Sequence, residues 1–467
     1  MTGTHALVLG GGLAGMLAAS VLSAHADRVT VVDRDRFTGG DRKGVPHGRH
    51  AHVLMAGGCR ALDDLLPGLT ASLLDAGAQH LGLPDRLLVL TQSGWLPRLA
   101  EMRFVLGCSR ALLDDAVRRR VRDRVELTEA TDVVGLLGDR AEVAGARVRD
   151  RATGVERDVE ADFVVDATGR GSHADSWLAD LGLPPVRDDR VDSGLVYATC
   201  LYRMPPGAGE GFPGISVQAD PRTSRFCQGG ALVPIEGRRW IVSLAGTRGG
   251  EPGTGPEEFL AFARGLRHPV IADFISAAEP LTRPFAFHAT VNRRRRYERL
   301  SPWPRGFVVM GDAACTFNPV YGHGMTVAAR QAVALRDGLA RHGLGGGAAG
   351  RLQRRFARVI DDPWQMAVAQ DLRYPDTIGP TRGGLALLRE HYLDRLVLAA
   401  TGRPAVTRAQ IDAYTLSKPL WTLLLSPRVV LGAVRGPGRP PAHDVPLTEA
   451  ESRALTADPR HRAPEVD

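Results

Sequence analysis

The feature that most constrains the fold is a glycine-rich turn between a short apolar run and a helical pattern near the start of the chain. Residues 10–15 are GGGLAG and fit the pattern GxGxxG. An apolar run, His5–Leu9, precedes the turn, helical periodicity extends over residues 13–24, and a second apolar run covers Arg28–Val32. This order predicts a βαβ unit that belongs to a parallel sheet.

The glycines and one acidic residue indicate a dinucleotide site. Gly10 permits a tight turn, Gly12 lets the backbone approach a pyrophosphate, and Gly15 lets helix and strand pack closely. Asp33 ends the second run eighteen residues after Gly15, where a carboxylate can accept a hydrogen bond from a ribose hydroxyl. The site is predicted to comprise Gly10, Gly12, Leu13, Ala14, Gly15, Asp33 and Arg34. FAD and NAD are both open at this point.

Size and composition describe a folded globular protein of more than one domain. The chain has 467 residues, 44% of them hydrophobic and 24% charged, and exceeds the usual size of a single core. Its formal charge of +7 is spread along the chain and carried mainly by arginine, so nucleic acid is not an expected partner. Five widely spaced cysteines without a CxxC pair are typical of reduced thiols, and no export signal opens the chain. A cytoplasmic location is expected.

No segment is expected to insert stably into a membrane. The most apolar stretch, residues 416–434, is broken by Pro419 and Pro427. It is expected to form an amphipathic helix pair packed on the body, with contact to a membrane surface as the alternative.

The segments predict an α/β fold with a discontinuous first domain. Residues 1–185 would form the first part of a Rossmann-type dinucleotide-binding domain, with an excursion into the substrate domain near residues 80–105. Alternating β segments predict a mostly antiparallel substrate-binding sheet over residues 186–290. Residues 291–345 would complete the first domain, and residues 346–467 would form a helical region with a mobile tail after Gly436.

A second motif decides between the two dinucleotides. Residues 306–332, GFVVMGDAACTFNPVYGHGMTVAARQA, resemble the second FAD fingerprint of the group A flavin monooxygenases, the family typified by aromatic hydroxylases. The resemblance implies that Asp312 binds the ribityl chain, that Pro319 lies beside the flavin ring, and that the backbone of residues 322–326 contacts the ring. A helix N-terminus there would stabilise the charge of reduced flavin. The cofactor residues implied are Asp312, Pro319, Gly322, Gly324, Met325 and Thr326.

Three further positions match the family. Arg42, Lys43, Gly44 and Val45 follow the second strand, where the family places an arginine that reaches the pyrophosphate. Arg110, in SRALLDDAV, matches the family's helical arginine that touches the cofactor. Asp166 stands in DATG where the family has a DG motif, so contact with nicotinamide and a packed strand end are both open for it.

The details of the motifs are similar to those of the flavin epoxidases of polyether ionophore biosynthesis, the monensin and lasalocid type. Cys315 replaces the usual His, Thr326 replaces the usual Asn, and the strings RKGVPHGRHAH and DATGRGS occur. The resemblance implies a monooxygenase in which a flavin C4a-hydroperoxide epoxidises alkenes of a polyene polyketide in antibiotic biosynthesis, with NAD(P)H as electron donor or a partner flavin reductase in its place.

The chain lacks the motifs of other catalysts. It has no HExxH, GxSxG or Walker A sequence, so no catalytic side chain is assigned beside the flavin, and Phe317 and Tyr321 are the pocket candidates. The histidines at 47, 50 and 52 are expected to be hydrogen-bonding loop residues near the flavin rather than metal ligands. The arginine run 293–296 is expected to be a solvated edge rather than a site for NADPH phosphates.

Other functions of such a chain stay open. An aromatic polyketide hydroxylase of the same family differs only in its pocket, and a non-catalytic protein that binds FAD and a hydrophobic ligand would keep the same motifs. A reductase that saturates isoprenoid double bonds shares parts of the scaffold. A flavin halogenase would need a lysine beside a WxWxIP-type sequence, which the six tryptophans do not form. The expected partners are O2 and a hydrophobic small molecule.

Overall fold

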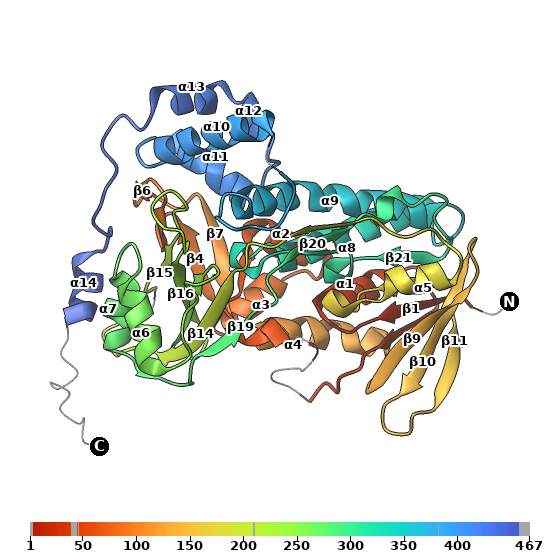
Figure 1. Ribbon diagram of the computed structural model, residues 1–467. Helices are drawn as coiled ribbons and strands as arrows, with labels where there is room; N and C mark the ends of the chain where they lie inside the picture. Colours follow the sequence, from red (N-terminus) through yellow and green to blue (C-terminus); the bar gives the residue numbers. More distant parts are fainter. Residues whose placement is uncertain (1–2, 39–43, 45, 209–210, 382, 457–467) are drawn as a thin grey trace, which may run out of the picture.

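A five-stranded parallel sheet forms the centre of one half of the molecule (Figure 1). In the computed structural model, which describes residues 3–38, 44, 46–208, 211–381 and 383–456, its strand order is β21-β12-β1-β2-β8. The strands are β1 (His5–Leu9), β2 (Arg28–Val32), β8 (Glu126–Thr128), β12 (Phe163–Asp166) and β21 (Phe307–Val309). All four pairs are parallel, which confirms the predicted Rossmann-type sheet.

Both faces of this sheet are covered, and strand β1 shows why its sequence is apolar throughout. Ala6 and Val8 pack toward the helices on one face, whereas Leu7 and Leu9 pack toward a three-stranded antiparallel sheet on the other. The helices are α1 (Leu13–Leu22), α4 (Arg110–Val121) and α8 (Gly324–His342). The covering strands are β9 (Thr131–Gly138), β10 (Val143–Asp150) and β11 (Glu156–Glu160). Strand β1 is therefore buried on both sides, which explains its continuous apolar run.

A second, mostly antiparallel sheet forms the other half. Its order is β18-β14-β17-β16-β15-β5-β6, with β19 also paired to β14, and only the β5–β15 pair is parallel. The strands are β5 (Leu87–Thr91), β6 (Gly94–Trp95), β14 (Val196–Arg203), β15 (Gly214–Val217), β16 (Gly229–Ile235), β17 (Arg239–Gly246), β18 (Glu279–Pro280) and β19 (Phe285–Phe287). Helices α6 (Pro256–Arg264) and α7 (Val270–Ser276) cover one face. The predicted separate antiparallel layer is confirmed.

Short elements join the two halves. Two further sheets have three strands each, in the orders β3-β7-β4 and β13-β20-β22. Their strands are β3 (Val53–Met55), β4 (Gln79–Leu83), β7 (Arg103–Gly107), β13 (Asp188–Val191), β20 (Asn292–Arg295) and β22 (Cys315–Thr316). The connecting helices are α2 (Ala56–Leu65), α3 (Leu69–Asp75) and α5 (Ala174–Asp180).

The last part of the described chain is helical, as predicted. Its first five helices lie in the upper part of Figure 1, and the last one lies beside α6 and α7. Its helices are α9 (Ala348–Asp371), α10 (Gly384–Ala400), α11 (Pro404–Tyr414), α12 (Thr422–Leu425), α13 (Pro427–Arg435) and α14 (Glu449–Thr456). Helices α10 to α13 pack on strands of the second half through a shared apolar cluster that includes Leu396, Val406 and Val429. None of the described helices is both long and apolar enough to cross a bilayer.

The segment after Gly436 differs from the expected mobile tail. It runs back to the second sheet, where Trp95 donates to the carbonyls of Ala442 and His443 at 3.2 and 3.1 Å. Further on, Arg98 pairs with Glu451 at 2.6 Å. Composition suggested mobility because proline-rich polar segments lack a core of their own, but here the body supplies the hydrogen-bond partners.

The arginine run 293–296 is also different from the expected solvated edge. Arg294 is only 2% exposed and pairs with Asp361 at 2.8 Å, and buried Arg295 donates to the Ala313 carbonyl at 2.8 Å. The two side chains are neighbours on strand β20 and therefore point to opposite faces, and both faces are covered. Each arginine has a partner from a distant segment that compensates for the loss of water. The prediction of a solvated edge is therefore wrong for Arg294 and Arg295, which belong to a buried strand.

Candidate functional site

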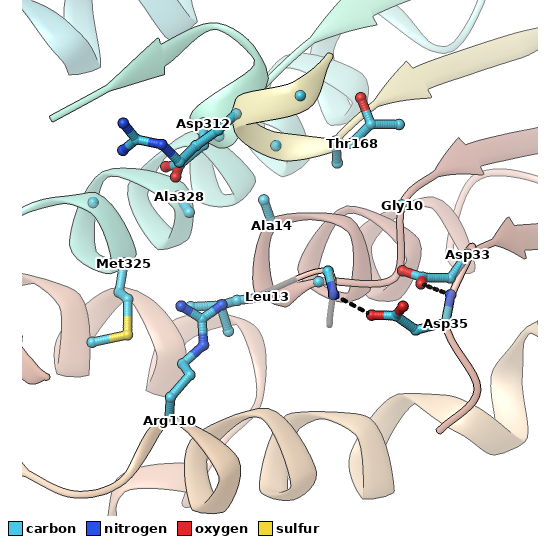
Figure 2. Close-up of a pocket in the computed structure, with 18 of the residues that line it drawn as sticks. Gly10, Leu13, Ala14, Asp33, Asp35, Arg110, Thr168, Asp312, Met325 and Ala328 are labelled. Carbon is cyan, nitrogen blue, oxygen red and sulfur yellow. Dashed lines mark hydrogen bonds between the residues drawn. The ribbon is translucent and has the colours of Figure 1, made fainter. Parts of the chain in front are cut away.

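A cavity of about 540 Å³ lies at the carboxyl ends of the parallel strands. Its lining begins at the glycine turn after β1, passes the ends of β2 and β12, and continues to the start of α8 and to Tyr197 on the second sheet. Open α/β sheets bind ligands at this edge because the strand-to-helix turns leave a crevice there. Figure 2 shows part of this lining.

The glycine turn has no room for side chains, so a ligand can approach its backbone closely. Gly10 has φ +97°, and a Cβ there would lie 2.5 Å from the Ala167 carbonyl oxygen. A Cβ on Gly15 would lie 1.8 Å from the Gly10 carbonyl oxygen, so Gly15 packs beneath the turn and does not line the cavity. Gly12 caps α1 without a side-chain hydrogen bond to the first helical amides. These amides can bind a phosphate.

The acidic residue after β2 organises the next part of the lining. Asp33 accepts hydrogen bonds from the backbone amides of Gly11 at 2.6 Å and Asp35 at 2.8 Å. Figure 2 shows Asp33 beside the Gly10 turn. Asp35 in turn accepts from the Gly44 amide at 2.7 Å, which places Gly44 on the cavity. A ribose can therefore meet a fixed carboxylate here.

The half-buried carboxyl group of Asp312 lines the cavity and is influenced by two cations. Asp312 follows β21, and burial raises the pKa of its carboxyl group, while Arg170 and Arg110 act in the opposite direction. Arg110 stands at the start of α4 and extends toward the Leu13 turn (Figure 2). Positive charge beside a helix N-terminus is suited to a pyrophosphate.

The far end of the cavity is formed by the loop that precedes α8. Pro319, Gly322, Gly324 and Met325 line it, as does the pocket candidate Phe317. Gly322 has φ +67°, which a glycine adopts without strain, and a Cβ there would lie 3.0 Å from the Met55 side chain. A flat group can approach this backbone closely.

His323 belongs to the same loop and has a fixed tautomer. Its Nε2 lies 3.2 Å from the Tyr414 carbonyl oxygen, which can only accept, so Nε2 carries the proton. Its Nδ1 is buried and has no partner among the described residues. Burial lowers the pKa of His323 to about 4. The neutral ring therefore offers an acceptor to a ligand that donates.

Most of the predicted site residues lie together, and a few do not. The predicted residues that line the cavity are Gly10, Gly12, Leu13, Ala14, Asp33, Arg34, Gly44, Arg110, Asp312, Pro319, Gly322, Gly324, Met325 and Phe317. Thr326 is buried against α2 and, like Gly15 and Tyr321, does not line it. The Tyr321 hydroxyl instead donates to Asp371. Arg42, Lys43 and Val45 lie outside the described residues.

Several lining residues carried too weak a signal to be assigned from the sequence. Thr168, Arg170, His173, Trp177, Tyr197 and Asn318 are in this group. His50 and His52 also line the cavity. Asp166 does not line it, because its carboxylate accepts from Thr168 and Ser172 in its own turn. This fits the packed strand end. No group of metal-ligating side chains occurs among the residues described.

A buried polar network supports the loop from behind. Asp371, at the end of α9, accepts from the side-chain amides of Asn292 at 2.6 Å and Asn318 at 3.2 Å, and from the Tyr321 hydroxyl. Asn292 Oδ1 accepts from the Asn318 backbone amide at 2.7 Å. The loop beside Pro319 is thus tied to α9 by groups that have lost contact with water.

This network makes the stability of the protein depend on pH. Burial raises the pKa of Asp371 to about 6 from 3.8, so the folded protein holds the proton more tightly than the unfolded chain. The resulting stabilisation is complete below about pH 4 and is lost as the pH rises through 6. The test is urea unfolding of the wild type and of Asp371→Asn at pH 4 and at pH 8. The difference between their free energies of unfolding should shift against the wild type by about 3 kcal/mol from pH 4 to pH 8. A difference that is independent of pH would contradict this.

Comparisons with known families and structures also indicate an FAD-binding fold. Residues 3–359 match the model of a family described as FAD binding domain. Protein Rv3254 of Mycobacterium tuberculosis (strain ATCC 25618 / H37Rv) is 32% identical over 389 residues, 79% of this chain and 80% of that protein.

Two solved structures have a similar fold. The flavin-dependent brominase Bmp2 has a TM-score of 0.65 at 16% identity and covers 92% of this chain and 98% of its own. PqsL, a probable FAD-dependent monooxygenase from Pseudomonas aeruginosa, has a TM-score of 0.59 at 19% identity, with 80% and 97% covered.

Proposed function

The chain belongs to the FAD-binding-domain family of flavin-dependent monooxygenases, and from this premise we propose that it epoxidises alkenes of a hydrophobic, polyketide-like substrate. Its cofactor is FAD. When bound and reduced, FAD supplies the activation of O2 from which one oxygen atom is transferred. The protein's part is to hold the cofactor, orient the double bond and keep water out.

The proposed cofactor contacts follow the length of the cavity. The amides at the start of α1 and the Arg110 guanidinium would bind the pyrophosphate, and Asp33 would bind the adenosine ribose. Asp312 would bind the ribityl chain, and the backbone from Gly322 to Met325 would contact the flavin ring. These roles fit the missing side chain at Gly10 and the unpartnered Nδ1 of His323.

One observation carries the proposal of a hydrophobic substrate. The cavity extends from the glycine turn to Tyr197 on the second sheet, and its lining also includes Phe317 and Met325 beside α8. Phe317 and Met325 have no charge or hydroxyl group, so this part of the lining can contact apolar carbon chains and exclude water. The motifs shared with polyether epoxidases favour an alkene as the reacting group.

An aromatic polyketide is the second candidate substrate. Tyr197 and Phe317 line the cavity with aromatic rings, against which fused rings can stack. Bmp2 supports only the fold and not halogenation, because the chain has no WxWxIP-type sequence. The two candidate reactions differ in substrate and not in cofactor.

The purified protein is expected to be yellow and to oxidise NADH or NADPH in the presence of O2 when a linear polyene is added. An added flavin reductase would replace the nicotinamide if electrons come from a partner. Mass spectrometry should show one added oxygen per converted alkene, and the saturated chain of equal length is the control. Turnover only of phenolic polycycles would assign the aromatic reaction. FAD binding without turnover of either substrate would point to the non-catalytic alternative.

A further inference from the structure

Two polar side chains from distant parts of the sequence meet at the lining of the cavity, and none of the cofactor contacts proposed above uses them. His50 precedes β3 and Tyr197 lies on β14, yet their ring centroids are 4.5 Å apart in an edge-to-face arrangement. Both residues line the cavity, and both are at most 4% exposed. Phe285 and Phe287 pack on His50 at 4.9 and 5.3 Å and hold the imidazole in place.

A chain of hydrogen bonds leads from the imidazole to Ser243. His50 Nδ1 lies 2.7 Å from Thr199 Oγ1, which lies 2.6 Å from Ser243 Oγ. Ser243 also accepts from the Ala51 amide at 3.3 Å. If Ser243 donates to Thr199 and Thr199 donates to Nδ1, every proton in the chain is used. In the reverse direction the hydroxyl of half-buried Ser243 would have to donate to water, because no acceptor lies among the described groups. The direction that uses every proton within the protein places the ring proton on His50 Nε2.

Neither group is charged. Burial lowers the pKa of His50 to about 3, and His52 adds to this effect. Burial raises the pKa of the Tyr197 hydroxyl above its ordinary value, although Arg170 opposes the rise. Within the described part of the chain, no hydrogen bond is formed by His50 Nε2, and the buried Tyr197 hydroxyl has no partner. The Tyr197 hydroxyl is therefore a buried donor without an acceptor, which is costly unless a ligand supplies one, and His50 Nε2 is free to bind the same ligand.

We propose that His50 Nε2 and the Tyr197 hydroxyl form a two-donor subsite for a neutral oxygen atom of the substrate, such as a ketone, hydroxyl or ether oxygen. A neutral subsite favours these groups over a carboxylate, whose burial would require a cation. Arg170 lowers the pKa of the Tyr197 hydroxyl, but it also lowers the pKa of the Asp312 carboxyl group, so its charge is shared with a carboxyl group of the protein. The subsite rests on the proposed function, because it fixes one oxygen of the substrate while the double bond lies elsewhere in the cavity.

The first test concerns the proton and needs no substrate. In holoenzyme labelled with ¹⁵N-histidine, the His50 ring should be neutral with its proton on Nε2 from pH 6 to pH 8. Thr199→Val should move the proton toward Nδ1, because it removes the donor to that nitrogen. An Nδ1-protonated ring or an imidazolium in the wild type would overturn the assignment.

The second test concerns recognition of oxygen. The probes are a linear polyene ketone and the polyene hydrocarbon of equal length, and their dissociation constants are measured from the absorbance change of oxidised, FAD-bound enzyme. The wild type should bind the ketone at least about tenfold more tightly. Tyr197→Phe and His50→Phe should each remove most of this preference while hydrocarbon binding is retained. Tyr202→Phe, on the same strand but off the cavity, is the matched control.

The outcomes separate the subsite from the proposed reaction. Equal binding of the two probes by the wild type, or binding of neither, overturns the subsite, as does an equal loss for both probes in the variants. A ketone preference without oxygen transfer to either probe supports the subsite and contradicts epoxidation, because the binding measurement requires no turnover.

Discussion

Replacement of Gly15 by alanine is expected to give a folded protein that purifies almost free of FAD. The added Cβ would lie 1.8 Å from the carbonyl oxygen of Gly10 and 2.9 Å from its carbonyl carbon. Both contacts are with backbone, so the turn must move away from α1. Because this turn has the amides that would face the pyrophosphate, even a shift of about 1 Å removes their alignment. The flavin band in the visible spectrum measures the bound fraction, and circular dichroism measures folding.

The control for this variant is another glycine whose surroundings are open. A Cβ on Gly135, in β9, meets nothing within 4 Å, so Gly135→Ala should retain full FAD. Gly10→Ala is a second variant of the turn, because φ +97° and the Ala167 carbonyl oxygen both oppose a side chain. A yellow Gly15→Ala protein with wild-type FAD content would contradict the proposed position of the pyrophosphate.

The parts of the fold that the sequence predicted well are determined by local physics. The strands His5–Leu9 and Arg28–Val32 were predicted with the bounds that the structure has. Their apolar runs are bounded by a glycine turn and by an acidic residue, so neighbours along the chain define them. The start of helix α4 is also determined locally, because Ser109 caps it by accepting from the Leu112 amide at 3.2 Å.

The parts that could not be predicted depend on contacts between distant segments. Phe317 and Tyr321 are both aromatic and lie four residues apart, yet only Phe317 lines the cavity, because Asp371 on α9 binds the Tyr321 hydroxyl. His50 and Tyr197 meet because β14 pairs with strands far along the chain. The ion pair between buried Arg294 and Asp361 likewise joins segments that are distant in the sequence. Patterns along the chain do not contain this information.

The network behind the loop links the C-terminal helices to the site. Asp371 ends α9, and the Tyr414 carbonyl at the end of α11 fixes the tautomer of His323. The C-terminal region, which the sequence predicted only to be helical, therefore sets the hydrogen-bonding character of the surface beside Gly322. This explains why the chemistry of the loop could not be derived from its own motif.

Arg110→Ala is expected to weaken FAD binding about 10- to 100-fold while the fold is retained. Its Nε donates to Asp114 at 2.7 Å, which fixes the guanidinium at the start of α4. Its other two nitrogens have no hydrogen bond in the described part of the chain and are close enough to Asp312 to affect the pKa of that carboxyl group. A hydrogen bond from a charged group contributes about 1.5–3 kcal/mol, which sets the expected range.

The matched control is on the same helix and tests whether charge alone is sufficient. Arg119 pairs with Asp115 at the same spacing of four residues, but its side chain is 60% exposed and does not line the cavity. Arg119→Ala should bind FAD as the wild type does, and Arg110→Lys should restore only part of the affinity, because an ammonium group lacks the guanidinium's planar fork of donors. Titration of apoprotein with FAD gives the three constants. Equal affinities of Arg110→Ala and Arg119→Ala would mean that the pyrophosphate does not lie beside Arg110.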